Sequence, residues 1–504
     1  MKRKQNQEKE LKMTVESVRK LAKDILADTA NLNNISTLLD SAKNHNLNPN
    51  ELHAIFTSLT YVFIKLSENS LLDKPAKKSD DPKSKVSKWL RENRLVFLQI
   101  MASNISHWDT RIQITSFEKS LELVREASER TNEFQNSFYY LIVEAILNLE
   151  SVNEILHSRI ISTLNEYDDL RYFFFKDSNK CMESILDQGK QTQKQSQIIF
   201  EILLKLNPAQ TDQDSIQMYC NATFTGKDES KTNQILVPNS YQRQFSDCWI
   251  TFLRFPMNSV TYKGILETMH QSIIPFLSQP TSLMDFLVDA YNSGGFISIL
   301  ALNGVFTLIH KHNLDYPHFY PKLYALFDKN VLHTKYRSRF FRMASLFLSS
   351  TYIPTYLVAS FIKRMCRIAL FAPPSSIIMI LPFIYNLLRL HPSCISLIHR
   401  TDVSMDEMND PYLFDKLDPN ESNAVDSCLW ELESLKRHYC PTVSKLALIF
   451  EDSLAKPSYD LEDFFDHSYK TLIDAEVHSK KINSEDIPPL ATKSESEWSE
   501  LWVF

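Results

Sequence analysis

Glycine is scarce in this chain: only 6 of its 504 residues are glycine, whereas average usage of about 7% would give about 35. Tight hairpin turns and phosphate-binding loops both depend on glycine, because it adopts positive φ angles and lets the backbone approach closely at little cost. The composition therefore argues against hairpin-rich sheets and against the usual nucleotide sites. With 43% hydrophobic residues, the chain can still bury a substantial core, and we expect an all-α protein.

Apolar residues recur at intervals of three and four along much of the chain, which is the spacing of one face of an α-helix. Residues Leu52, Ile55, Leu59, Val62 and Leu66 form one such face. Prolines and polar stretches separate successive faces, so we expect helices of about 12–20 residues with short connections. Because no exact repeat period is visible, the sequence predicts a degenerate HEAT- or armadillo-like α-solenoid.

Polar segments divide the predicted solenoid into two helical halves. We assign residues 1–206 to an N-terminal helical-repeat region, and within it we expect a basic loop at 73–94. Residues 207–240 are polar and poorly periodic, which is typical of a linker. The second helical domain is expected at 241–451 and an acidic C-terminal tail at 452–504.

The charges of the second half are segregated along the sequence. From Lys329 through Arg400 there are ten Lys or Arg and no Asp or Glu, and from Thr401 through Leu435 there are ten Asp or Glu and one Lys. Since charged residues make up 23% of the chain, such runs are improbable by chance.

The basic residues of this segment fall into two clusters that helix stacking would bring into one ridge. Their members are Lys335, Arg337, Arg339, Arg342, Lys363, Arg364 and Arg367. Two interpretations are open. The ridge binds an external polyanion or an acidic partner, or the chain's own acidic stretch at 402–433 neutralises it.

The last residues of the chain form a second candidate interaction site. Trp498, Leu501, Trp502 and Phe504 follow an acidic stretch, and their spacing would place them on one side of a short helix that docks in a groove. The groove would belong either to this chain or to a partner.

No familiar catalytic or metal-binding motif is present. The chain contains no GxxxxGK[ST], GxGxxG, HExxH or GxSxG sequence. The histidines between His310 and His333 lack a carboxylate or thiol at ligand spacing on one helix face, and no two of the seven cysteines form a CxxC pair. The sequence therefore predicts a non-enzymatic protein without metal or cofactor, with reduced thiols in the cytosol or nucleus.

Two uncharged runs have the length of a bilayer span: 20 residues between Arg342 and Lys363, and 21 between Arg367 and Arg389. Both runs contain proline and several serines, and a proline break would leave backbone amides unsatisfied in lipid. We therefore expect buried helices. A multi-pass nuclear-membrane protein and a soluble helical transport adaptor remain the alternatives.

Three strings, HNLDYP, LSSTYIPTYLVASFIKR and LPFIYNLLRLHP, lie within residues 301–400. Together with residues 410–450 they resemble the CCAAT-binding-factor domain of the nucleolar complex family, and the resemblance covers about 250–455. Residues 405–409 depart from the family pattern. The N-terminal half resembles the family only in its general helical character.

This resemblance implies a non-enzymatic ribosome assembly factor of the nucleus and nucleolus. Members of the family are helical-repeat proteins, and the resemblance implies work in the small-subunit processome, on 18S pre-rRNA processing and 40S maturation. The implied partners are a nucleolar protein fourteen homologue, the 90S pre-ribosome, and pre-rRNA through phosphate contacts. It implies no membrane association.

Overall fold

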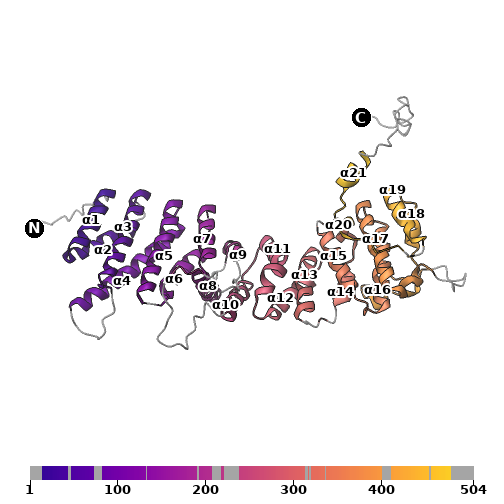
Figure 1. Cartoon of the computed structure of the whole chain (residues 1–504), viewed down its shortest axis with the longest axis horizontal. Helices are drawn as coiled ribbons and strands as arrows, with labels where there is room; N and C mark the ends of the chain where they lie inside the picture. The colour runs from indigo at the N-terminus through magenta and orange to yellow at the C-terminus, as the bar shows by residue number, and fades with distance from the viewer. Residues whose placement is uncertain are drawn as a thin grey trace, which may run out of the picture. The chain divides into compact units, whose positions relative to one another are not determined.

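The computed structural model of the chain is built from helices and short 3-10 or π turns. It describes residues 14–43, 47–72, 82–131, 133–151, 153–189, 192–206, 217–220, 238–312, 316, 319–334, 336–399, 410–452, 454 and 456–477. These ranges contain no strand, and the helices pack in successive pairs (Figure 1), which confirms the predicted all-α solenoid. The chain forms two compact units, Met1–Asp285 and Phe286–Phe504.

The first unit is a two-layered stack of helices (Figure 1). One layer contains α1 (Val15–Ala27), α3 (Pro49–Glu68), α5 (Thr110–Thr131) and α7 (Glu154–Glu166). The other contains α2 (Asn34–Lys43), α4 (Pro82–Ser103), α6 (Asn136–Leu147) and α8 (Asp168–Gln188). The stack continues through α9 (Gln193–Lys205), α10 (Pro238–Phe252) and α11 (Ser259–Thr268).

Local signals in the sequence explain where several of these helices begin and end. Thr14 and Ser17 form a capping box before α1, and Asn48 and Glu51 form another before α3. These side chains satisfy amides that the first helical turn leaves without a partner. At the other end, α8 stops at Gly189, whose φ of +65° is a left-handed conformation that glycine adopts without strain.

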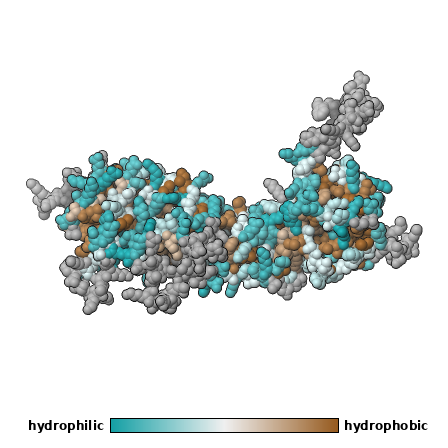
Figure 2. All heavy atoms as spheres, in the orientation of Figure 1, coloured by the Kyte–Doolittle hydropathy of each residue, from teal (hydrophilic) through white to brown (hydrophobic). Residues whose placement is uncertain are grey.

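The interior between the two layers is apolar and aromatic. Phe56 and Phe63 of α3 both contact Phe97 of α4, and all three rings are buried. The outward faces carry mostly polar side chains, and Figure 2 shows largely hydrophilic residues over the visible surface of α1 to α7. The helical stripes therefore drive the layers together by burying their apolar faces.

Two boundaries differ from those expected from sequence. Residues 82–94, assigned to a basic loop at 73–94, lie in α4, while 73–81 are outside the described residues. The division between the units lies after Asp285 rather than at 207–240, because α10 packs against α8. The rings of Tyr241 and Phe245 on α10 contact Phe175 of α8.

Part of the expected linker is also fixed to the first unit. The carboxylate of Asp169 on α8 accepts hydrogen bonds from the backbone amides of Tyr219 and Cys220, both at 3.0 Å. Asp168 and Gln217 are joined through their backbones at 2.8 Å. Residues 217–220 therefore belong to the packed structure of this unit.

The second unit is again helical, and its central helices are deeply buried. The division after Asp285 falls within α12 (Met284–Asn292). The helices that follow are α13 (Gly295–His312), α14 (Phe319–Leu326), α15 (Arg337–Leu348), α16 (Thr355–Ala369), α17 (Pro374–Leu390), α18 (Trp430–Lys436), α19 (Pro441–Ala447), α20 (Glu462–Phe465) and α21 (Tyr469–Val477). Gly294 and Gly295, at the junction of α12 and α13, have φ angles of +78° and +61°, a left-handed conformation that glycine adopts without strain at the end of a helix.

The two uncharged runs form parts of α15, α16 and α17. The first run is interrupted between Leu348 and Thr355, and the second begins its helix at Pro374. Almost every residue of α16 and α17 is buried in the unit. None of the helices in the described ranges is long and apolar enough to cross a membrane.

Candidate functional site

Lys363 and Arg367 of α16 lie in a buried ion cluster. The ammonium group of Lys363, which has no exposed surface, lies 2.9 Å from the carboxylate of Asp410 and 2.8 Å from that of Glu431. Arg367 contacts the same two carboxylates at 2.8 and 3.2 Å. Asp410 and Glu431 both belong to the acidic stretch, so the chain's own carboxylates neutralise this part of the basic segment.

Further hydrogen bonds complete the cluster. Burial alone would raise the pKa of Asp410, but hydrogen bonds from Ser427, Lys363 and Trp430 outweigh it and lower the pKa to about 2. The Trp430 indole donates at 3.0 Å, and the Lys363 ammonium also donates to the backbone carbonyl of Cys428 at 2.6 Å. A buried ion pair is costly unless its remaining donors and acceptors are satisfied, and these bonds largely meet that condition.

Arg364, also on α16, lies outside this ion cluster and binds backbone carbonyls and aromatic rings. Its guanidinium donates to the backbone carbonyls of Phe327, at 2.7 Å, and Phe414, at 3.2 Å. It also lies over the rings of Tyr324 and Phe414, at 4.5 and 5.0 Å from their centroids. These contacts are cation–π interactions. Arg364 is buried, and its recorded contacts are with its own chain.

The basic residues of α15 hold the C-terminal segment. Arg337 donates to the hydroxyls of Ser375 and Ser376 at 3.1 Å and to the carbonyl of His467. Burial lowers the pKa of Arg337. Arg342 forms a bidentate pair with Glu462, at 2.8 and 2.6 Å, while its side chain stays 43% exposed.

Arg339 points to a different neighbour. When the Asn303 amide is turned so that its oxygen faces Arg339, that oxygen accepts hydrogen bonds from the guanidinium. Lys335 lies outside the described residues, as do Trp498, Leu501, Trp502 and Phe504. The structure therefore shows own-chain contacts for the described members of the predicted ridge, and their role in binding a partner or RNA stays a prediction.

The segment that follows α19 crosses α15 and α17 as a strap, comprising residues 456–467. The Asn386 side chain of α17 exchanges two hydrogen bonds with the backbone of Tyr459, at 2.8 and 2.9 Å. Ser338 donates to the carbonyl of Phe465 at 2.7 Å, and the Phe465 ring is buried. The beginning of the expected acidic tail is thus part of the folded second unit.

A groove runs beside this strap. Its volume is about 830 Å³, and its lining includes Arg342 and Leu346 from α15, Arg389 and Leu390 from α17, and Glu462 from the strap. Leu346 and Leu390 are exposed although they are large and apolar. Exposed apolar side chains rimmed by charge are typical of protein interfaces.

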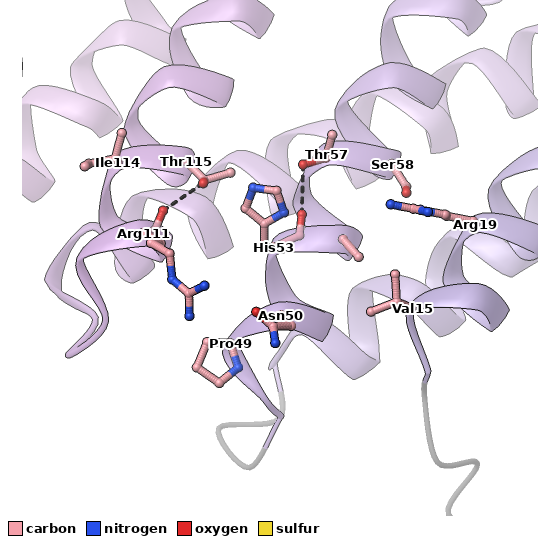
Figure 3. A pocket seen from close by; sticks show the side chains of 11 residues that line it. Val15, Arg19, Pro49, Asn50, His53, Thr57, Ser58, Arg111, Ile114 and Thr115 are labelled. Atoms are coloured by element: carbon pink, nitrogen blue, oxygen red, sulfur yellow. Dashed lines mark hydrogen bonds between the residues drawn. The ribbon is translucent and has the colours of Figure 1, made fainter.

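A second groove lies on the first unit and was not identified from sequence. Its volume is about 560 Å³, and α1, α3 and α5 contribute Arg19, His53 and Arg111 (Figure 3). This groove was not predicted, because its residues lie on separate helices that are far apart along the chain. The sequence feature that could have indicated it is a basic residue within the first two turns of each of α1, α3 and α5.

Among the described residues, no three His, Cys, Asp or Glu side chains are grouped as metal ligands would be. His310 and His312 lie at the end of α13. The cysteines of the described ranges are free thiols, and most of them are buried.

Comparisons with known proteins match both halves of the chain. A family model described as nucleolar complex protein 4-like, TPR repeats, matches residues 5–187, and the CBF/Mak21 family model matches residues 298–447. An uncharacterized protein of Schizosaccharomyces pombe is 36% identical over 95% of this chain and 100% of its own length.

Named relatives agree with these models. The nucleolar complex protein 4 homolog of Gallus gallus is 37% identical over 74% of this chain and 73% of its own length. The Homo sapiens homolog is 37% identical over 70% of this chain and 67% of its own length. The resemblance noted in the sequence is confirmed and extends to the N-terminal helices, and the chain belongs to the nucleolar complex protein 4 family.

Proposed function

We propose that this protein is a non-enzymatic ribosome biogenesis factor of the nucleolus, acting as a helical scaffold in the small-subunit processome. In this role it supports 18S pre-rRNA processing and maturation of the 40S subunit. The observation that carries the proposal is the pair of family matches, to the nucleolar complex protein 4-like repeats at 5–187 and to the CBF/Mak21 family at 298–447. That family is not known for enzymes.

The packing of the second unit suits a scaffold. The ion cluster around Lys363 and the strap held by Asn386 and Arg342 fix segments that lie far apart in the sequence. A preorganised surface loses less conformational entropy when a partner binds. We propose that Lys363, Arg364 and Arg367 act indirectly, by holding that surface in place.

The partner is proposed to be the nucleolar protein fourteen homologue, within the 90S pre-ribosome. The groove beside the strap is its proposed docking surface, because Leu346 and Leu390 present apolar side chains and Arg342 and Arg389 flank them. Apolar anchors at the centre of a charged rim supply most of the energy of many protein interfaces.

Purification of the tagged protein from cells tests the function. We expect the nucleolar protein fourteen homologue and 18S precursors to co-purify. Enrichment of large-subunit precursors instead would contradict the assignment to the small subunit.

A double variant, Leu346→Glu and Leu390→Glu, tests the docking surface. It places charge where apolar contact is proposed, so we expect recovery of the partner to fall by at least about 10-fold. Leu413→Glu with Leu448→Glu is the matched control, since both leucines are similarly exposed on the same unit but lie outside the groove. Equal recovery with the two double variants would contradict this surface and leave the assignment to ribosome assembly intact.

A further inference from the structure

We propose that the groove on the first unit binds single-stranded RNA, with Arg19, His53 and Arg111 contacting phosphates and Trp108 stacking on a base. The inference rests on the proposed function only for the presence of RNA near the protein. Its physical basis is the lining of the groove and the exposure of the Trp108 indole, three residues before Arg111.

Two arginines and a histidine line the groove, and none of the described lining residues is Asp or Glu. In Figure 3 the His53 ring lies between Arg111 on one side and Arg19 on the other, each from a different helix. Arg19 and His53 are exposed at the surface. These side chains offer hydrogen-bond donors to the groove without a carboxylate in its lining to compete for them.

The ion pair that Arg111 forms with Asp109 leaves its guanidinium accessible. Asp109 contacts the Arg111 guanidinium at 3.3 Å, yet the Arg111 side chain remains 70% exposed. The Asp109 carboxylate also accepts a hydrogen bond from the Arg111 backbone amide at 2.8 Å. Asp109 therefore caps the start of α5, and the outer face of the guanidinium stays open to a ligand.

The donors are arranged as a row. Helices α1, α3 and α5 lie side by side in one layer, and neighbouring packed helices are about 8–10 Å apart. Each contributes one basic side chain from its first two turns, and Val15 and Pro49, the first residues of α1 and α3, also line the groove. The positive ends of these helix dipoles add to the potential of the row. A nucleic acid strand carries one negatively charged phosphate per nucleotide, so it can offer a phosphate to each of these donors.

Trp108 makes RNA the favoured polyanion. This residue precedes Arg111 by three positions at the same end of α5, and it is 79% exposed, although tryptophan is usually buried. The His107 ring lies 5.2 Å from it, centroid to centroid. Proteins that bind single strands combine a basic groove with exposed aromatic rings on which bases stack, and an acidic peptide has no flat base to place there.

Fluorescence anisotropy with the full chain and a labelled oligouridylate of about 12 nucleotides tests the proposal. The double variant Arg19→Ala, Arg111→Ala is expected to bind roughly 10-fold more weakly. Its salt dependence should also fall by about 1.4 in log–log slope, since each phosphate contact on a single strand contributes about 0.7. For Trp108→Ala we expect binding about 5- to 100-fold weaker, the range for loss of one stacked base.

Two matched controls separate the groove from general surface effects. Arg243, on α10, is 77% exposed and pairs with an acid four residues away, so Arg243→Ala removes a similar cation elsewhere on the same unit. Tyr439 is as exposed as Trp108, so Tyr439→Ala removes a similar aromatic surface. Both controls should retain wild-type affinity, and unchanged thermal melting of every variant would exclude unfolding as the cause.

Three outcomes would overturn the proposal: no RNA binding by the wild type, equal affinity of the arginine double variant and its control, or a Trp108→Ala variant of wild-type affinity. If oligoglutamate of equal charge displaces RNA while Trp108→Ala has no effect, the groove takes an acidic protein instead. Loss of RNA binding with normal recovery of 18S precursors would contradict this inference alone. Recovery of no ribosomal precursor with intact RNA binding would contradict the proposed function alone.

Discussion

In the second unit Lys363 of α16 points inward to carboxylates, whereas in the first unit Arg19 and Arg111 remain at the surface of α1 and α5. The buried charges of the first unit include carboxylates on α8. Asp169 accepts hydrogen bonds from backbone amides, and Asp177 accepts one from the Asn136 side chain at 2.8 Å. The first unit also buries Arg171, which pairs with Asp168. The units therefore differ in which basic side chains stay exposed, and both bury charge.

The difference shows that a run of like charge in a sequence does not reveal which charges are exposed. The second unit contains an acidic stretch that folds back on the basic one, and its Asp410 and Glu431 neutralise Lys363 and Arg367. In the part of the chain that the structure describes, no Asp or Glu lines the groove of the first unit, although its basic residues are few and scattered. Whether a basic side chain is exposed depends on which other segments pack against it, and those segments can lie far away in the sequence.

The largest expected effect is that of Lys363→Ala. Removing the ammonium leaves the partly exposed Arg367 as the one cation that contacts Asp410 and Glu431 in the described structure. Breaking a buried pair costs about 3–5 kcal/mol, and we expect a loss near the lower end of that range. Urea unfolding followed by the fluorescence of Trp430, whose ring lies 5.6 Å from the Lys363 ammonium, measures the change in stability of the second unit.

Two further variants sharpen that measurement. Arg389→Ala on α17 removes an exposed cation and should change stability by less than about 0.5 kcal/mol. Replacing both members of the pair, as Lys363→Met with Glu431→Leu, should recover most of the loss because no isolated charge remains at Glu431. A Lys363→Ala variant as stable as Arg389→Ala would show that the cluster is not buried in solution.

Asp169→Ala tests the buried carboxylate of the first unit. The substitution leaves the amides of Tyr219 and Cys220 without their acceptor, and unsatisfied buried donors cost about 1–3 kcal/mol each. We expect residues 217–220 to detach and the unit to lose about 2–4 kcal/mol of stability.

Alkylation of Cys220 provides the readout. Its thiol is buried, and burial raises its pKa to about 12, so little reactive thiolate is present. In the Asp169→Ala variant we expect labelling by a maleimide to be at least about 10-fold faster. Cys248, buried on α10, serves as the internal control, and if both thiols accelerate equally, the variant has unfolded more widely than proposed.

Asp177→Asn should stabilise the first unit at neutral pH. Burial raises the pKa of Asp177 to about 6, against the opposing hydrogen bond from Asn136. The pKa of Asp177 is higher in the folded protein than in the unfolded chain. Its contribution to the free energy of unfolding is therefore fully present below about pH 4, where the acid is protonated in both states, and is lost as the pH rises through about 6.

The gain from Asp177→Asn should therefore be near zero at pH 4 and grow to at most about 3 kcal/mol at pH 8. Denaturant midpoints measured across this pH range give the profile. Asp247→Asn, an exposed acid on α10, is the control and should show no such pH dependence. A gain that is independent of pH would show that Asp177 is not buried as a carboxylate.

The helical framework was predictable because helix formation is local. Leu52, Ile55 and Leu59 repeat at three and four residues, and all are buried. The loop expected at 73–94 shows the limit of this approach. Its lysines and serines obscured a weaker stripe that includes Leu90, which is buried in α4.

The candidate sites were harder to predict, because side chains distant in the sequence determine them. The burial of Lys363 depends on Glu431, which is 68 residues away. The groove of the first unit is assembled from Arg19, His53 and Arg111, none of which stands out in its own helix. A single sequence gives the type and spacing of residues, but it does not give the packing that brings them together.

The smallest expected effect is that of Arg342→Ala, which breaks the bidentate pair with Glu462 on the strap. Both side chains are substantially exposed, at 43% and 57%, and exposed ion pairs contribute only about 0.2–1 kcal/mol. We therefore expect near-normal stability, with faster amide exchange confined to residues 458–467. Wild-type exchange would show that the hydrogen bonds of Asn386 and Ser338 hold the strap without this pair, whereas a loss above about 3 kcal/mol would mean that Arg342 is as buried as Lys363.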